Sequence, residues 1–219
     1  MIVCQCANVT DRDIHTAIEE GAHSVPAIVD ATGAGQCCAP CRDEIVITTK
    51  VTHRTGKDIN AIGSSRRHIM IEIEKSLQRL GTDRIDLYFI HYVTDVSDEL
   101  TPAVKAWAEK TKAEGKIRFF GFSTHKNMQA SMRQAATLGW LDGIMMSYNY
   151  RLMVKNKMKR AVDACVKAGL GFTAMKTQAA FSANFYASIG SETDSAMKMT
   201  ENFIKNGYTS EQAKLKVVW

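Results

Sequence analysis

Four cysteines near the start of the chain have the type and spacing of a metal-binding set. They form two pairs, one Cys-x-Cys and one Cys-x-x-Cys, which are Cys4 with Cys6 and Cys38 with Cys41. Thiolates in such pairs bind iron–sulfur clusters, and tetrahedral thiolate sites also suit Zn²⁺. Cys37 is a further thiol beside the second pair, able to take the place of Cys38. The pattern predicts a metal site, and four sulfurs alone do not choose between the two metals.

Polar residues end a series of apolar runs in the rest of the chain. The runs cover residues 44–50, 85–91, 117–123, 143–149 and 171–176, and they end on Lys50, His91, Ser123, Asn149 and Lys176. Each run has the length of a strand, and amphipathic stretches of helical length separate them. Because parallel strands deliver their last residues to one edge of a sheet, we expect these side chains to gather where reactive groups lie in α/β proteins.

Two short helices are expected to bring the cysteine pairs together. Thr10 begins the first, with Asp13 at the position that completes a capping box. Ser24 followed by Pro26 begins the second, and Gly33 ends it. Residues 1–43 therefore read as a small helical metal-binding domain.

The remaining residues, 44–219, predict about five βα units. Helices are expected over residues 68–80, 127–138 and 155–167, and a further helix opens at Thr101-Pro102, between the first two. Residues 195–219 are expected to be helical, with a break at Gly207. The fold class is α/β: an incomplete (β/α)8 TIM barrel preceded by the small helical domain.

Composition and charge exclude several classes of protein. No run of about 18 apolar residues exists, so we expect no membrane association, and the first residues lack the pattern of a secretory signal. The net charge of +5 comes from basic residues scattered among acidic ones, and no nucleic-acid motif is present. Clustered thiols in a chain of this kind favour a cytoplasmic protein over a disulfide scaffold.

The front segment resembles the 2Fe–2S-binding domain of bacterioferritin-associated ferredoxin. The residues that carry the resemblance are MIVCQCANVTDRDI and GAGQCCAPC. The resemblance implies that Cys4, Cys6, Cys38 and Cys41 bind a 2Fe–2S cluster, with zinc as the alternative, and that a redox protein is a partner.

The body resembles an aldo/keto reductase, a (β/α)8 barrel enzyme that reduces small carbonyl compounds with NADPH. The resemblance rests on ITTKV, EIEKSLQRLGTDRIDLYFIH, KAEGKIRFFGFSTH and the YNY and AMK strand ends. It implies Lys50 and His91 as catalytic residues. It implies cofactor contacts for Ser123, Thr124, Asn149 and Lys176.

The same pattern shows departures from the family. The family's catalytic Asp and its general-acid Tyr come from a segment before the lysine strand, and residues 1–43 contain no tyrosine. Five βα units do not close a barrel, and open strand edges favour a homo-oligomer. We therefore carry two hypotheses: an NADPH-dependent reductase fused to a 2Fe–2S module, and an electron-transfer or binding module whose barrel part is an inactive scaffold or a truncated fragment.

Overall fold

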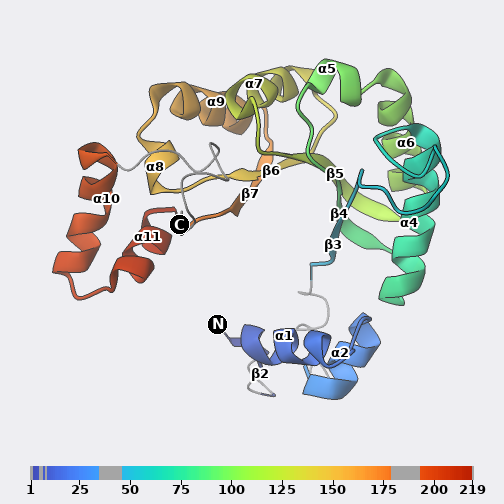
Figure 1. The fold of residues 1–219 in the computed structure, drawn as a ribbon, viewed down its shortest axis with the longest axis horizontal. Coiled ribbons are helices and arrows are strands. Elements are labelled where there is room, and N and C mark those ends of the chain that lie inside the picture. The colour runs from blue at the N-terminus through green and yellow to red at the C-terminus, as the bar shows by residue number, and fades with distance from the viewer. Residues whose placement is uncertain (1, 5–6, 8, 35–45, 179–192, 219) are drawn as a thin grey trace. The chain divides into compact units, whose positions relative to one another are not determined.

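The computed structural model describes residues 2–4, 7, 9–34, 46–178 and 193–218. The chain divides into two compact units. The first comprises Met1–Tyr88 and Ala106–Arg118, and the second comprises Phe89–Lys105 and Phe119–Trp219. Figure 1 labels the elements of both units.

The first unit begins with a two-stranded antiparallel sheet and two helices. These elements are β1 (Ile2–Cys4), β2 (Val9–Thr10), α1 (Asp11–Glu19) and α2 (Val25–Thr32). The predicted capping box is confirmed, because Thr10 Oγ1 accepts from the Asp13 N–H and Asp13 Oδ2 accepts from the Thr10 N–H. Ser24 caps α2, and Gly33 ends it in the left-handed conformation that glycine adopts without strain.

The rest of the first unit includes β3 (Thr48–Val51), α4 (Arg66–Leu80) and most of α6 (Pro102–Ala113). Helix α4 buries Ile69, Ile73 and Leu77, as the spacing of its apolar residues predicts. Tyr88 and Trp107 pack with their ring centroids 5.9 Å apart and form part of this unit's core.

A five-stranded sheet has the order β3-β4-β5-β6-β7, which is the order of the strands along the chain. Its other members are β4 (Ile85–Ile90), β5 (Ile117–Thr124), β6 (Gly143–Ser147) and β7 (Gly171–Met175). In the second unit β6 pairs in parallel with both β5 and β7, with Ser123 opposite Met145 and Ser147 opposite Met175. The carboxyl ends of these strands therefore share one edge.

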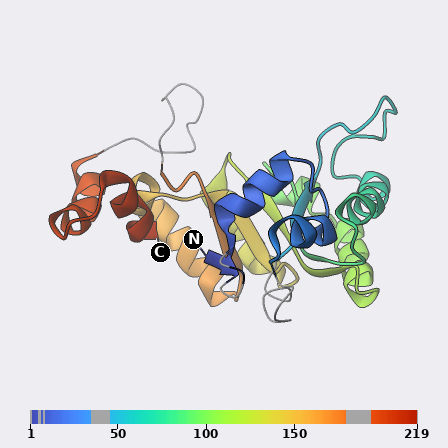
Figure 2. The ribbon, with the colours of Figure 1, turned by 90° about the horizontal axis from the view of Figure 1, so that it is seen from below.

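Helices of the second unit follow its strands. They are α5 (Val96–Glu99), α7 (Met128–Leu138), α8 (Tyr150–Met153), α9 (Asn156–Lys167), α10 (Asp194–Lys205) and α11 (Ser210–Val218). Helices α7 and α9 pack against each other, and the buried Cys165 thiol of α9 donates to the Met132 carbonyl of α7. Helices α10 and α11 form a hairpin that is seen from a second direction in Figure 2.

The α/β fold class, with parallel strands alternating with helices as in a partial barrel, is confirmed. One boundary is corrected. The strand expected over residues 44–50 runs from Thr48 to Val51, so Lys50 lies inside the strand, and residues 44 and 45 lie outside the described part. Among the described residues no helix is both long and apolar enough to cross a membrane.

Candidate functional site

His91 and Ser123 lie together at the carboxyl ends of β4 and β5 in the second unit. Nδ1 of His91 is 2.8 Å from Oγ of Ser123, and the Tyr92 N–H donates to the same oxygen over 3.1 Å. The Ser123 side chain is completely buried. A hydroxyl has one proton to donate and two lone pairs that accept, so Ser123 can accept from Tyr92 and either donate to Nδ1 of His91 or accept from it. When Ser123 donates, a neutral His91 carries its proton on Nε2.

A second group of polar side chains lies at the ends of β5, β6 and β7 in the same unit. Nζ of Lys176, after β7, is 3.2 Å from Nδ1 of His125, after β5. The Ser147 hydroxyl at the end of β6 is 3.3 Å from the same nitrogen. An ammonium group only donates, so Nδ1 of His125 accepts and Nε2 holds the proton. Burial lowers the pKa of Lys176 from its ordinary value, since desolvation disfavours the cation.

The aromatic rings of this edge are close enough to form one cluster. The His91 and His125 ring centroids are 6.3 Å apart, and the Tyr92 ring is 6.3 Å from His91 and 5.7 Å from His125. Strand ends β4 to β7 therefore present two imidazoles, a phenol, a lysine and two serine hydroxyls, which we call the polar edge: His91, Tyr92, Ser123, His125, Ser147 and Lys176.

Backbone strain marks the polar edge. Tyr92 has φ 64° and Lys176 has φ 55°, a left-handed conformation that non-glycine residues adopt at a cost of about 1–3 kcal/mol. Lys176 directly follows the last residue of β7, and Tyr92 lies two residues after the last residue of β4. Residues held in such conformations cluster at functional sites.

Two of the predicted cofactor contacts use their side chains to fix the backbone. The Asn149 side chain accepts from the N–H groups of Arg151 and Leu152 as the N-cap of α8, and its amide donates to the Lys176 carbonyl. The Thr124 hydroxyl donates to the Lys126 carbonyl. Asn149 therefore holds the segment that carries Lys176, and a cofactor contact for Asn149 and Thr124 stays a prediction.

Lys50 belongs to the first unit, where it lies on β3 with an exposed side chain. Its catalytic role stays a prediction.

The thiol ligands also stay predictions. Cys6, Cys38 and Cys41 lie outside the described residues, and of Cys4 only the backbone in β1 is described, paired with Val9. Within the described ranges no three His, Cys, Asp or Glu side chains gather as metal ligands would.

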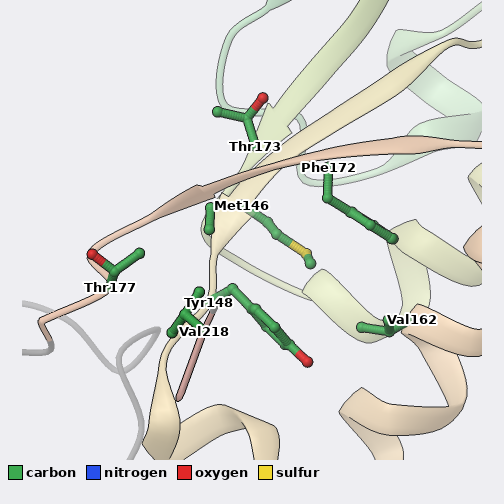
Figure 3. A pocket seen from close by; sticks show the side chains of 8 residues that line it. Met146, Tyr148, Val162, Phe172, Thr173, Thr177 and Val218 are labelled. Carbon is green, nitrogen blue, oxygen red and sulfur yellow. The ribbon is translucent and has the colours of Figure 1, made fainter. Parts of the chain in front are cut away.

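An apolar cavity of about 480 Å³ lies in the second unit. Figure 3 shows side chains from β6, β7 and α9 around it, among them Met146, Tyr148, Phe172 and Val162. The residues that line the cavity do not include those of the polar edge. Burial, with a contribution from Asp163, raises the pKa of Tyr148.

The strand-end pattern did not single out Tyr92 or Ser147. Tyr92 follows a strand end by two residues, and the turn that points it back toward His91 is visible only in its backbone angle. Ser147 sits two residues before the end expected for its run, because β6 ends at Ser147 and Asn149 caps the next helix. Ser147 is a polar residue in the otherwise apolar β6, and this is the sequence signal that could have identified it.

Comparison with known proteins identifies both parts of the chain. The model of the aldo/keto reductase family matches residues 32–213, and that of the BFD-like [2Fe-2S] binding domain matches residues 2–46.

Relatives with similar sequences are reductases and dehydrogenases. An aldo-keto reductase of Fusarium vanettenii is 30% identical over 115 residues, which cover 52% of this chain and 30% of that protein. The NADH-specific methylglyoxal reductase of Escherichia coli is 35% identical over 121 residues, covering 49% of this chain and 36% of that protein. A putative aryl-alcohol dehydrogenase of Schizosaccharomyces pombe is 34% identical over 116 residues, covering 51% and 32%. The matched part is about a third of the length of these relatives.

Solved structures agree on the fold. The holo form of an aldo-keto reductase from Bacillus halodurans superposes with a TM-score of 0.53 at 23% identity, covering 77% of this chain and 57% of that one. A putative aldo-keto reductase from Pseudomonas aeruginosa gives 0.52 at 25% identity, covering 68% and 56%.

Proposed function

The chain belongs to the aldo/keto reductase family, and we propose that it reduces small carbonyl compounds by hydride transfer from NADPH. The observation that carries the proposal is the polar edge, because His91 and Ser123 lie together where barrel enzymes place their reactive groups. Members of this family use NAD(P)H. The choice of NADPH is part of the proposal.

The donor set of the polar edge fits such a cofactor and a carbonyl substrate. Imidazole, hydroxyl and ammonium groups all donate hydrogen bonds, which a carboxamide, a phosphate and a carbonyl oxygen accept. When bound, the nicotinamide ring supplies the hydride. The proposed cofactor contacts are Ser123, Thr124, Asn149 and Lys176, and the side chains of Asn149 and Thr124 also hold the backbone beside them.

His91 is proposed to orient the substrate. In this proposed role Ser123 donates to Nδ1 of His91, and Nε2–H donates to the carbonyl oxygen and polarises the carbonyl group for hydride transfer. Lys50 is proposed as the lysine of the catalytic set, on its resemblance to the family pattern.

The experiment is a reductase assay with NADPH and with NADH, using para-nitrobenzaldehyde and methylglyoxal as substrates. We expect the wild type to oxidise cofactor only when a carbonyl compound is present, and His91→Gln to lose that activity. His15→Gln on α1, an exposed histidine, is the matched control and should behave as wild type. A folded wild type that oxidises neither cofactor with either substrate would refute the proposal.

A second proposed function is electron transfer through a 2Fe–2S cluster on Cys4, Cys6, Cys38 and Cys41. It is supported by the family model over residues 2–46 and by a donor set made of thiolates. The cluster would act as an electron relay to a redox partner protein or as a structural element. A cytoplasmic location is part of this proposal, since thiolate ligands persist in a reducing compartment.

We also propose that the chain forms a homo-oligomer. In the described sheet β3 and β7 are the two ends of the strand order, and unpaired strand edges favour association. Sedimentation equilibrium tests this directly, and a monomer at micromolar concentration would contradict it.

A further inference from the structure

Reduction of a carbonyl group needs a proton donor as well as a hydride. The hydride adds to carbon, and the oxygen must receive a proton to become an alcohol. The family pattern takes that proton from a tyrosine before the lysine strand, and residues 1–43 contain none. The inference below rests on the proposed reductase function and concerns which phenol serves as the donor.

Two of the five tyrosines in the described residues are fully buried. Tyr88 is completely buried in the first unit, and desolvation raises its pKa, which makes it a weaker acid. Tyr150 is also completely buried, and its hydroxyl accepts a hydrogen bond from Nε of Arg151 over 3.1 Å. Neither hydroxyl is accessible to a substrate.

Two other tyrosines lie away from the polar edge. Tyr148 lines the apolar cavity, and the residues that line this cavity do not include those of the polar edge (Figure 3). Tyr208 lies between α10 and α11, with its ring 6.1 Å from Phe203. The fifth, Tyr92, is part of the polar edge itself.

Tyr92 is held in place by three independent contacts. Its backbone N–H donates to Oγ of Ser123, the atom that also contacts His91. Its ring lies against the rings of His91 and His125, and Nζ of Lys126 lies 5.9 Å from the ring centroid in a cation–π contact. The residue is 37% exposed, so a ligand can reach it.

Strain supports a role for this position. Tyr92 keeps a left-handed backbone with φ 64°, which a bulky residue adopts at a cost. The hydrogen bond from the Tyr92 N–H to Ser123 stabilises this backbone conformation and so offsets part of that cost.

We propose that Tyr92 is the catalytic proton donor of this reductase. The substrate oxygen accepts hydrogen bonds from the Tyr92 hydroxyl and from Nε2 of His91. As the hydride pair from the nicotinamide forms the new C–H bond, the π electrons of the C=O bond move to oxygen, and the Tyr92 O–H proton passes to that oxygen. The products are an alcohol, the oxidised nicotinamide and a tyrosinate, which regains its proton from water at the exposed ring.

The test compares Tyr92→Phe with Tyr148→Phe in the intact chain. Both changes remove one hydroxyl and keep the ring, but only the first lies on the polar edge. With para-nitrobenzaldehyde, we expect Tyr92→Phe to lose about 10²–10⁴-fold in kcat, the usual contribution of general acid catalysis. Its Kd for NADPH should stay that of wild type. Tyr148→Phe should keep its kcat within about threefold, because its hydroxyl faces the cavity.

A binding readout separates this proposal from the reductase function. Fluorotyrosine placed by site-specific incorporation at position 92, or in a second preparation at position 148, gives one fluorine resonance whose assignment needs no Tyr92→Phe variant. We expect that resonance, and not the Tyr148 resonance, to shift when para-nitrobenzyl alcohol is added without cofactor. This arm also works if Tyr92→Phe folds poorly.

The outcomes are distinct. If wild type turns over and Tyr92→Phe keeps most of the wild-type kcat, the donor role is overturned and the reductase function stands. An unshifted Tyr92 resonance at saturating alcohol would also overturn it. A wild type without turnover would remove the reductase function, and the donor role with it.

Discussion

Nζ of Lys176 lies 3.2 Å from Nδ1 of His125, so a lysine from the end of β7 and a histidine from the end of β5 share one hydrogen bond. The contact joins two strand ends that are not neighbours in the sheet, with Ser147 of the intervening strand beside them. It shows that the sheet edge is organised as a single polar group across β5, β6 and β7.

The first prediction concerns the pH dependence of stability at Lys176. Burial lowers the pKa of Lys176 below 10.5, so at a pH between the two values the unfolded chain binds more protons than the folded chain. The free energy of unfolding therefore increases as pH rises from the pKa of Lys176 in the folded chain to its pKa in the unfolded chain. Below both pKa values, the buried cation destabilises the folded state by its full cost. We expect the stability of wild type relative to Lys176→Met to increase between neutral pH and about pH 10 in urea denaturation.

Lys167→Met is the control for this prediction, because Lys167 is an exposed lysine in the last turn of α9. Its stability difference from wild type should not change with pH. Parallel pH profiles for wild type and Lys176→Met would show that the Lys176 cation is not penalised in the folded state.

The second prediction concerns the cap at Asn149. Asn149→Ala removes the acceptor for two N–H groups of α8 and the donor to the Lys176 carbonyl at a completely buried position. We expect a loss of about 1–3 kcal/mol in the free energy of unfolding, and a smaller loss for Asn149→Ser, which keeps a capping oxygen.

Lys155 provides the comparison for Asn149, since it is the N-cap of α9 and makes no side-chain capping bond. Lys155→Ala should change the free energy of unfolding by less than about 0.5 kcal/mol. Equal losses at the two caps would contradict the assignment.

The third prediction concerns the close approach of β5 and β6. A Cβ atom on Gly121 would overlap the carbonyl oxygen of Gly143, its partner in the register, and would lie 3.2 Å from Cε1 of Phe89. Because a backbone atom cannot move aside cheaply, we expect Gly121→Ala to lose at least about 2 kcal/mol of stability. Gly56→Ala, where the added atom meets only Cβ of Ala61 at 3.5 Å, should be nearly neutral. A melting temperature for Gly121→Ala equal to that of wild type would contradict the observed pairing.

The fourth prediction concerns the thiols. Anaerobically purified protein should contain about two iron and two sulfide ions per chain, as expected for a 2Fe–2S cluster. Serine at Cys4, Cys6 or Cys41 should abolish the visible absorption. Parallel changes at Cys37 and Cys38 would show which of the two is the ligand.

Cys165→Ser is the control for the ligand changes, because this thiol is buried and burial raises its pKa to about 11. It should keep the cluster. Zinc without iron or sulfide in the purified protein would contradict the iron–sulfur assignment.

Periodicity predicted the elements of the body well, because buried strands and amphipathic helices follow from local sequence. The strand over residues 85–91 and the helix over residues 155–167 match β4 and α9 within a residue. Capping chemistry predicted the ends of α1 and α2 at Thr10, Ser24 and Gly33.

The polar edge was only partly predictable, because its contacts depend on backbone turns after the strands. His91, Ser123 and Lys176 were identified from their positions at the ends of apolar runs. The capping role of Asn149 and the strained turn at Tyr92 depend on φ angles and on partners in other strands, which no local pattern contains.

The most direct test of the reductase function is transfer of deuterium from the cofactor to the product. Wild-type protein is incubated with para-nitrobenzaldehyde and NADPH that carries deuterium at the transferable position of the nicotinamide ring, and the alcohol is analysed by mass spectrometry. We predict one deuterium on the carbinol carbon of the alcohol with wild type, and no labelled alcohol with His91→Gln. Absence of labelled alcohol after incubation with stoichiometric wild-type protein would contradict the account.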